Sequence, residues 1–172
     1  MIAVKDVLTG FAYRTDSHII KIGSGPENAL ILPDPHMTPA EQNAYKKIMS
    51  VCLFPVRISQ EHAQLYDSNG RIYLVDRKSP HGVYIDIDTL DCGEARILQI
   101  NHKWFLANND RALNVEIEKN DWERLRVLPN TSYPINSGTS FALGRYPFRL
   151  LDEEMWDKEK NKRFMPHGND QD

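Results

Sequence analysis

Short runs of apolar residues, separated by polar turn residues, dominate the pattern of this 172-residue chain. Runs of this length and composition are typical of β-strands. The pattern predicts strands over Ala3–Val7, His18–Ile22, Ala29–Leu32, Ala63–Tyr66, Ile72–Val75, Val83–Ile85, Ile97–Ile100, Trp104–Ala107, Ala112–Glu118, Leu125–Leu128, Ser140–Leu143 and Phe148–Leu151. Many short strands with frequent turns indicate an all-β sandwich or barrel.

The turn signals differ in strength. Asp67-Ser68-Asn69-Gly70 is the strongest, because Asn-Gly supplies the positive φ angles that a tight hairpin needs. Asn108-Asn109-Asp110 and Asn120-Asp121 are weaker signals of the same kind. These turns predict hairpins between neighbouring strands.

One helix interrupts the β pattern. Thr38-Pro39-Ala40-Glu41 forms a capping box with proline at the first helical position. An apolar stripe at helical spacing follows, made of Ala44, Tyr45, Ile48, Met49 and Cys52. The stripe has two interpretations, which are packing against the sandwich and binding of a partner.

Composition sets the broad class. With 41% hydrophobic and 26% charged residues, the chain has the composition of a globular domain and is long enough to bury a core. The N-terminus lacks the pattern of a secretory signal, and the longest apolar runs are too short to span a membrane. Cys52 and Cys92 show no paired spacing. We therefore expect reduced thiols and a nuclear or cytoplasmic location.

The charge is concentrated at one end of the chain. From Asp152 onward there are seven acidic and four basic residues, a net charge of −3, which equals that of the whole chain. The preceding 151 residues are therefore neutral, whereas nucleic-acid binders usually carry a basic face. We expect neither a nucleic acid nor a membrane as partner.

Two polar loops, each next to a predicted strand, carry the strongest functional signal. The first is in VRISQEHAQLY, where Ser59 and His62 lie three positions apart. The second is in YLVDRKSPHGVYID, where Asp76, Ser79 and Gly82 are separated in the same way. Loops that close short strands of a sandwich are a common place for recognition sites.

These motifs resemble the forkhead-associated (FHA) domain, a module that reads phosphothreonine. Two further blocks carry the resemblance in the right order, HIIKIGSGPENALILPD and YPINSGTSFALGRYPFRLL. The resemblance implies an 11-stranded β-sandwich over residues 1–151, with loops at one end that hold a phosphopeptide. It also implies two insertions, an inserted short helix within about 34–55 and an inserted hairpin region within about 88–130. Residues 152–172 then form a charged tail, partly disordered or folded as a short helix.

The resemblance transfers only in part to the site. Four residues match supporting positions: Gly23, His62, Asp76 and Gly82. His62 matches a histidine that braces the binding loops, and Ser59 a serine that contacts phosphate. The candidates for phosphopeptide binding are Ser59, Arg57, Ser24, Gln60, Lys78, Ser79 and His81.

Three of these candidates depart from the family. Ser24 and Gln60 stand where the family has arginine, and His81 stands where it has asparagine. Because a planar guanidinium can donate two charge-assisted hydrogen bonds to phosphate, the loss of both arginines should weaken recognition. Arg57, Lys78 and neighbouring Arg77 leave positive charge near the loops.

Each candidate also has a structural interpretation. Ser59 could satisfy backbone groups of its own loop, and His81 could be an ordinary exposed loop residue. The histidines show no metal-ligand spacing, and Gly23-Ser24-Gly25 leads into a strand pattern rather than into a phosphate-binding helix. We therefore expect no enzymatic activity, no catalytic residue, no metal and no cofactor.

Two hypotheses for the function remain. In the first, the chain is a protein-protein interaction domain of a regulatory or scaffold assembly in which phosphothreonine recognition is weak or lost. In the second, it is a working reader of phosphothreonine peptides with a divergent pocket. The partner is a protein in both, and in the second it is phosphorylated on threonine.

Overall fold

The computed structural model describes residues 1–51, 57–86, 96–100, 103–108, 111–118 and 121–165. Its strands form two sheets. Sheet A has the order β15 (Lys162–Phe164), β2 (Ala12–Thr15), β1 (Ile2–Asp6), β14 (Tyr146–Leu151), β13 (Ser140–Leu143), β7 (Val83–Asp86), β11 (Asp121–Val127), β10 (Arg111–Glu118), β9 (Lys103–Asn108), β8 (Arg96–Ile100). Sheet B has the order β12 (Ser132–Ile135), β6 (Arg71–Asp76), β5 (Ala63–Ser68), β3 (Ile19–Gly23), β4 (Leu30–Ile31).

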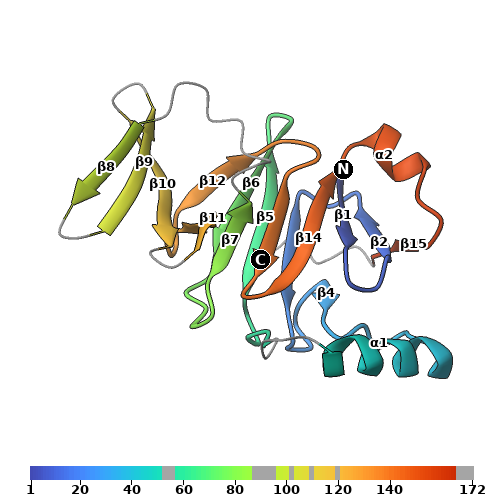
Figure 1. Ribbon diagram of the computed structural model, residues 1–172. Helices are drawn as coiled ribbons and strands as arrows, with labels where there is room; N and C mark the ends of the chain where they lie inside the picture. Colours follow the sequence, from blue (N-terminus) through green and yellow to red (C-terminus); the bar gives the residue numbers. More distant parts are fainter. Residues whose placement is uncertain (52–56, 87–95, 101–102, 109–110, 119–120, 166–172) are drawn as a thin grey trace.

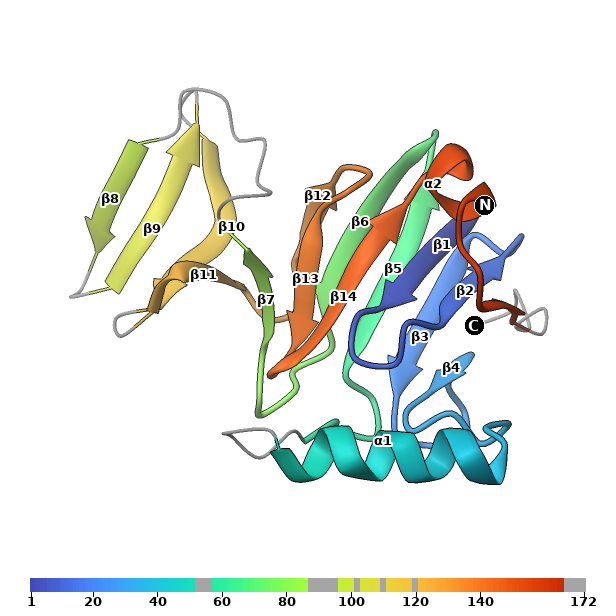
Figure 2. The same cartoon turned by 45° about the vertical axis from the view of Figure 1, so that its right-hand side comes forward.

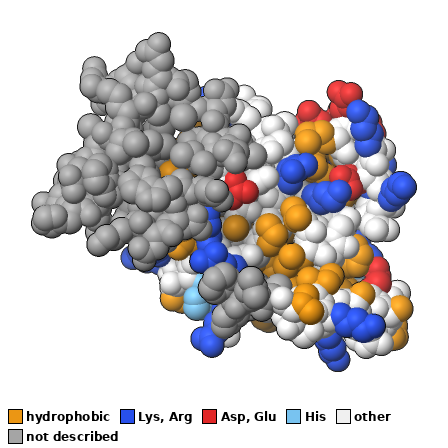
Figure 3. Space-filling model, viewed as in Figure 1, with side chains coloured by type: hydrophobic (Ala, Val, Ile, Leu, Met, Phe, Trp, Pro, Cys, Tyr) orange, Lys and Arg blue, Asp and Glu red, His pale blue; other side chains and the backbone are white. Residues whose placement is uncertain are grey.

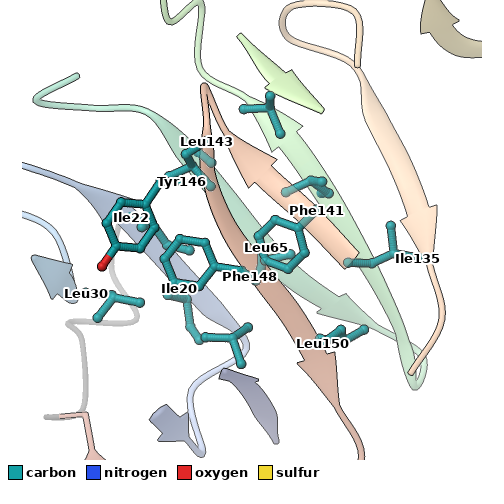
Figure 4. Packing of buried hydrophobic residues seen from close by; sticks show 14 of the residues in the cluster. Ile20, Ile22, Leu30, Leu65, Ile135, Phe141, Leu143, Tyr146, Phe148 and Leu150 are labelled. Carbon is teal, nitrogen blue, oxygen red and sulfur yellow. The ribbon is translucent and has the colours of Figure 1, made fainter. Parts of the chain in front are cut away.

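The two sheets pack face to face around one apolar core. Figure 4 shows Ile20 and Leu65 of sheet B beside Phe141, Phe148 and Tyr146 of sheet A, with the side chains of both sheets filling the space between them. The ring centroids of Phe141 and Phe148 lie 5.6 Å apart in a stacked arrangement. The predicted all-β sandwich is therefore confirmed.

The second predicted insertion forms an antiparallel meander. β8, β9, β10 and β11 pair in sequence, and β11 pairs with β7, so the meander continues sheet A. Figures 1 and 2 show it extending from one side of the sandwich. Because this meander and β15 add to the sandwich, the described residues contain fifteen strands rather than the eleven implied by the family resemblance.

The strongest predicted turn is present. Asn69 and Gly70 have φ angles of 54° and 80°, and they connect β5 to β6 with Ser68 opposite Arg71. The amide of Gly70 also donates to the Asp67 carboxylate at 3.0 Å. A two-residue loop with positive φ at both positions fits the right-handed twist of the two strands.

Helix α1 (Pro39–Val51) starts at the predicted capping box. The Thr38 amide donates to Oε1 of Glu41 at 3.0 Å, and the Glu41 amide donates to Oγ1 of Thr38 at 3.2 Å. Tyr45 and Met49 pack against the core, which supports the packing interpretation of the stripe. Ala44, by contrast, is exposed, no residue of the helix is buried, and Cys52 lies outside the described residues.

Helix α1 lies at the end of the sandwich that also carries the loop before β5. Figure 2 shows the helix running across the lower end of the sandwich, where the loop before β5 lies, and in both views the helix lies below β4. Neither α1 nor the other described helix is long and apolar enough to cross a membrane.

Residues 152–165, the described part of the predicted tail, fold back onto sheet A. Helix α2 (Glu153–Asp157) is capped by Asp152, whose carboxylate accepts the Met155 amide at 2.8 Å. Trp156 is buried in a small apolar cluster beside β1 and β2, and its ring meets Phe164 edge to face. β15 then pairs with β2 in parallel.

Two strands of the sandwich have no counterpart in the sequence prediction. β2 is buried at three of its four positions, so it lacks the alternation that marks a half-exposed strand. β12 contains Pro134, which argues against a strand. β12 is the edge strand of sheet B, however, and an edge strand tolerates proline because one side of its backbone has no neighbour.

Candidate functional site

The candidate residues come together at one end of the sandwich because backbone hydrogen bonds join their loops. The amide of Ser24, just after β3, donates to the Ser59 carbonyl at 2.9 Å, and the Gly25 amide donates to the Gln60 carbonyl at 3.1 Å. Asn28, in the same loop, donates from Nδ2 to the Gln60 carbonyl at 2.6 Å. The loop after β3 and the loop before β5 therefore form one unit.

Gly23 permits this close approach. A Cβ atom at this position would stand 2.1 Å from the Gln60 carbonyl oxygen and 2.8 Å from Nδ2 of Asn28. Both distances are shorter than real Cβ contacts. Any side chain at residue 23 would therefore separate the two loops, so the glycine is required for lack of space rather than for its φ angle.

His62 joins a third loop to the first two. The Ser59 amide donates to Nδ1 of His62 at 3.2 Å, so Nδ1 acts as an acceptor. Nε2 lies 2.7 Å from the Gly82 carbonyl and must then carry the proton that it donates. The ring is completely buried, and burial lowers the pKa of His62 from its usual 6.5. His62 is thus held neutral as one tautomer between two loops.

The loop between β6 and β7 is held by Asp76 and Ser79. Oδ1 of Asp76 accepts both the amide of Ser79 at 2.9 Å and its hydroxyl at 2.8 Å, and the Ser79 hydroxyl accepts the Gly82 amide at 3.1 Å. Asp76 and Ser79 are both buried. The structure therefore gives Ser79, a candidate for peptide contact, a supporting position beside Asp76.

Ser59 is only partly accessible. Its backbone amide and carbonyl hold His62 and Ser24, whereas its hydroxyl oxygen is buried and has no hydrogen-bond partner in the described part of the chain. A buried hydroxyl without a partner is unusual and costs stability. A ligand oxygen could reach this hydroxyl only after a local rearrangement.

The other candidates point outward. Ser24, Arg57, Gln60, Lys78 and His81 are all exposed on these loops, and Lys78 has a positive φ of 59°. Their neighbour Arg77 is half-buried and forms an ion pair with Glu61, with 3.5 Å between Nη2 and Oε2. The surface of this end therefore carries positive charge contributed by side chains other than the two arginines of the family, and Figure 3 shows Lys and Arg side chains beside a His side chain at the lower end of the face that it draws.

The structure also brings two arginines of β11 to these loops, and sequence reasoning missed both. The Arg124 guanidinium stacks on the Tyr84 ring, 3.6 Å from its centroid, and donates to the Gly144 carbonyl. Nε of Arg126 is buried and lies 3.1 Å from the place where a Cβ of residue 82 would stand. Only the pairing of β11 with β7 makes these contacts, and no local motif marks it.

Gly144 completes the arrangement. Its amide donates to the Gly82 carbonyl at 2.8 Å, which is also the acceptor for His62. A continuous series of hydrogen bonds therefore runs from Ser59 through His62, Gly82 and Gly144 to Arg124. The loops of both sheets are fixed relative to one another at this end.

In the described residues no group of three or more histidine, cysteine, aspartate or glutamate side chains is placed to hold a metal. The groups available to a ligand are exposed donors, cations and backbone edges of the loops. Such a surface suits recognition of a peptide segment.

A family model agrees with the resemblance seen in the sequence. The model of the FHA domain matches residues 46–111, which confirms the predicted FHA resemblance there. The matched range contains Ser59, His62, Asp76 and Gly82, but it does not reach Gly23. No curated protein matches the chain.

Several solved structures are similar to this chain at low sequence identity. The FHA domain of the CT664 protein from Chlamydia trachomatis is 17% identical, with 88% of this chain and 96% of that chain covered, at a TM-score of 0.45. Mycobacterium tuberculosis EmbR in complex with a low-affinity phosphopeptide is 13% identical, with 87% of this chain and 24% of that chain covered, at a TM-score of 0.46. The FhaA FHA domain complexed with the intracellular domain of Rv3910 is 13% identical, with 87% of this chain and 99% of that chain covered, at a TM-score of 0.43.

Proposed function

We propose that this chain is a non-enzymatic, FHA-like protein-interaction domain whose loop end binds a segment of a protein partner, with weak or lost recognition of phosphothreonine. The loop end is the surface of the loops after β3, before β5 and between β6 and β7. A regulatory or scaffold assembly is the setting that fits such a domain. The partner is a protein and is neither a nucleic acid nor a membrane.

One observation carries this proposal. The scaffold around His62 is complete, yet the hydroxyl of Ser59 is buried and an exposed serine, Ser24, stands where the family resemblance has arginine. Phosphate recognition normally uses a guanidinium that makes two charge-assisted hydrogen bonds. The supporting half of the site is therefore intact, whereas the half that would hold phosphate is reduced.

A second candidate function is phosphothreonine reading through a divergent pocket. The exposed side chains of Arg57 and Lys78 favour it, because they supply positive charge at the loop end, and the exposed ring of His81 adds a hydrogen-bonding group. The match to the FHA family model favours it as well. In this case the cations would replace the absent arginine as point charges, with less geometric selectivity.

A paired peptide titration separates the two functions. A library of threonine peptides, each phosphorylated and unphosphorylated, is titrated against the chain and against Ser59→Ala. Under our proposal, binding peptides show no strong preference for phosphate, and Ser59→Ala does not change the preference. A phosphate preference at micromolar affinity that disappears in Ser59→Ala would establish the second function instead.

Restoring the missing arginine provides the matched test. Ser24→Arg should create a preference for the phosphorylated peptides, because one charge-assisted hydrogen bond contributes about 1.5–3 kcal/mol. Ser68→Arg adds the same charge at the far end of β5 and serves as the control. An equal gain in both variants would mean that net charge, rather than the position of residue 24, governs phosphate binding.

A further inference from the structure

A pocket of about 470 Å³ lies where the open edges of the two sheets meet. β4 is the edge strand of sheet B, and β15 is the edge strand of sheet A. Residues of both strands line the pocket, together with Pro26, Asn28 and Ala29 of the loop after β3. The pocket therefore adjoins the loop end but is distinct from the surface around Ser59.

Much of the pocket wall is apolar. Leu30 and Ile31 come from β4, Phe164 is the last residue of β15, and Met165 follows it. Phe164 is 75% exposed, which is unusual for an aromatic side chain and places a large apolar surface next to the pocket. A large aliphatic or aromatic side chain entering here would cover that surface.

The charged groups at the pocket already have partners. Nη2 of Arg163 lies 2.5 Å from the Glu41 carboxylate, and its guanidinium lies 4.0 Å from Phe11. Lys162 donates to the Asp157 carbonyl at 3.1 Å. Asp34 also lines the pocket, with its carboxylate 4.0 Å from Nε of Arg163, so the walls carry both signs of charge and favour neither an acidic nor a basic ligand.

Asn28 forms part of the wall of this pocket. It is only 5% exposed, and its Nδ2 donates to the carbonyls of Gly25 and Gln60. Its Oδ1 is buried and has no hydrogen-bond partner in the described residues. Like the Ser59 hydroxyl, this buried acceptor could meet a ligand N–H donor only after a local rearrangement, and the new hydrogen bond would then add stability. A peptide backbone carries one such donor at nearly every residue.

We propose that this pocket binds an uncharged apolar side chain of the same extended partner segment that contacts the loop end. The proposal rests on the proposed function. Asn28 contacts both regions, because it lines the pocket and hydrogen-bonds to Gln60 beside Ser59. A strand advances about 3.3 Å per residue, so a few residues of extended chain cover both places. The open edge of β4 also offers backbone groups to such a segment.

The experiment uses the full chain and a phage-displayed library of random peptides. Affinities of the enriched peptides are measured for the wild type and for Ile31→Trp, which fills the pocket, and Phe164→Ala, which removes an apolar wall. Val51→Ala is the matched control, since Val51 is 77% exposed on α1 and does not line the pocket. Gln60→Trp tests the loop end.

We expect enriched peptides to share one apolar position and to bind Ile31→Trp and Phe164→Ala roughly tenfold more weakly, about 1.4 kcal/mol. Val51→Ala should bind them as the wild type does. Melting temperatures report whether each variant is folded. If Ile31→Trp is unfolded, Phe164→Ala decides alone, because its exposed side chain tolerates removal.

The results distinguish a failure of this inference from a failure of the proposed function. Peptides that lose affinity for Gln60→Trp but bind both pocket variants normally would overturn this inference and leave the proposed function standing. Peptides that depend on the pocket but not on Gln60 would overturn the shared segment and the loop-end function together. Enrichment of no peptide at all would overturn the proposed function, and the inference with it.

Discussion

The loops joined by His62 and helix α1 lie at the same end of the sandwich, but they are stabilised in opposite ways. The loops are held by buried hydrogen bonds from a completely buried imidazole, and they close against Gly23 with no spare space. Helix α1 has no buried residue and is held by its capping box, by Tyr45 and Met49 on the core, and by the ion pair of Glu41 with Arg163.

This difference means that the loops should contribute more than α1 does to the free energy of unfolding of the whole domain. Removing one partner of a buried hydrogen bond leaves the other unsatisfied and costs free energy of unfolding. Exposed caps and ion pairs contribute less, and their loss affects local order first. We therefore expect the loop geometry to fail only with the fold, whereas α1 can change its order while the sandwich stays intact.

The largest effect should come from Gly23→Ala. The added methyl group would stand 2.1 Å from the Gln60 carbonyl oxygen, so the two loops must separate. Overpacking of this kind costs about 3 kcal/mol, measured as the free energy of unfolding in urea. Gly70→Ala is the control, because it places a methyl in open space and meets only the strain of a φ of 80°. Equal losses in the two variants would show that the close approach of the loops contributes nothing.

His62→Ala should be next in size. It removes the acceptor of the Ser59 amide and the donor to the Gly82 carbonyl, and both groups are then left without this partner. A loss of about 2 kcal/mol is expected, visible as a lower melting temperature. His81→Ala, an exposed substitution on the loop between β6 and β7, should change stability by less than about 0.5 kcal/mol. A normal melting temperature for His62→Ala would contradict the bracing role.

The sequence predicted best what depends on a few adjacent residues. Asn69-Gly70 specified its hairpin and Thr38 with Glu41 specified the start of α1, because turn and cap chemistry act over a few positions. The sequence could not predict the positions of Arg124 and Arg126, since their place beside Gly82 follows from the pairing of β11 with β7, which β8, β9 and β10 separate along the chain.

The sequence also could not predict which individual atoms are buried. The sequence indicates that Ser59 and His62 are three residues apart, but the direction of each side chain depends on how three loops close together. The buried hydroxyl of Ser59 and the shared acceptor at Gly82 are results of that closure. The family resemblance supplied the bracing role of His62, and the structure supplied its hydrogen-bond partners.

Acid should destabilise the loops through His62. Its folded-state pKa lies below 6.5, so at pH values under 6.5 the unfolded chain binds the proton first and stability falls. A proton on Nδ1 would also face the Ser59 amide with a second donor. The difference in melting temperature between wild type and His62→Ala should therefore shrink from about pH 8 to about pH 5.

Comparison with the variant is needed because Asp6 acts in the opposite direction. Burial raises the pKa of Asp6 above 3.8, so protonation of this carboxyl favours the folded state as the pH approaches that value. Both proteins contain Asp6, and its contribution cancels in the difference. A difference that grows toward low pH would mean that His62 is protonated in the folded state.

The smallest effect on the whole protein should come from Thr38→Ala. The hydroxyl of Thr38 accepts the Glu41 amide at the start of α1, and loss of such a cap costs about 1 kcal/mol of helix stability. Amide exchange across Pro39–Val51 should become roughly fivefold faster, while the melting temperature of the sandwich changes little. Ser50→Ala, at the other end of α1, is the matched control. If Thr38→Ala lowers the melting temperature as much as His62→Ala does, α1 is as integral to the fold as the loops that His62 joins.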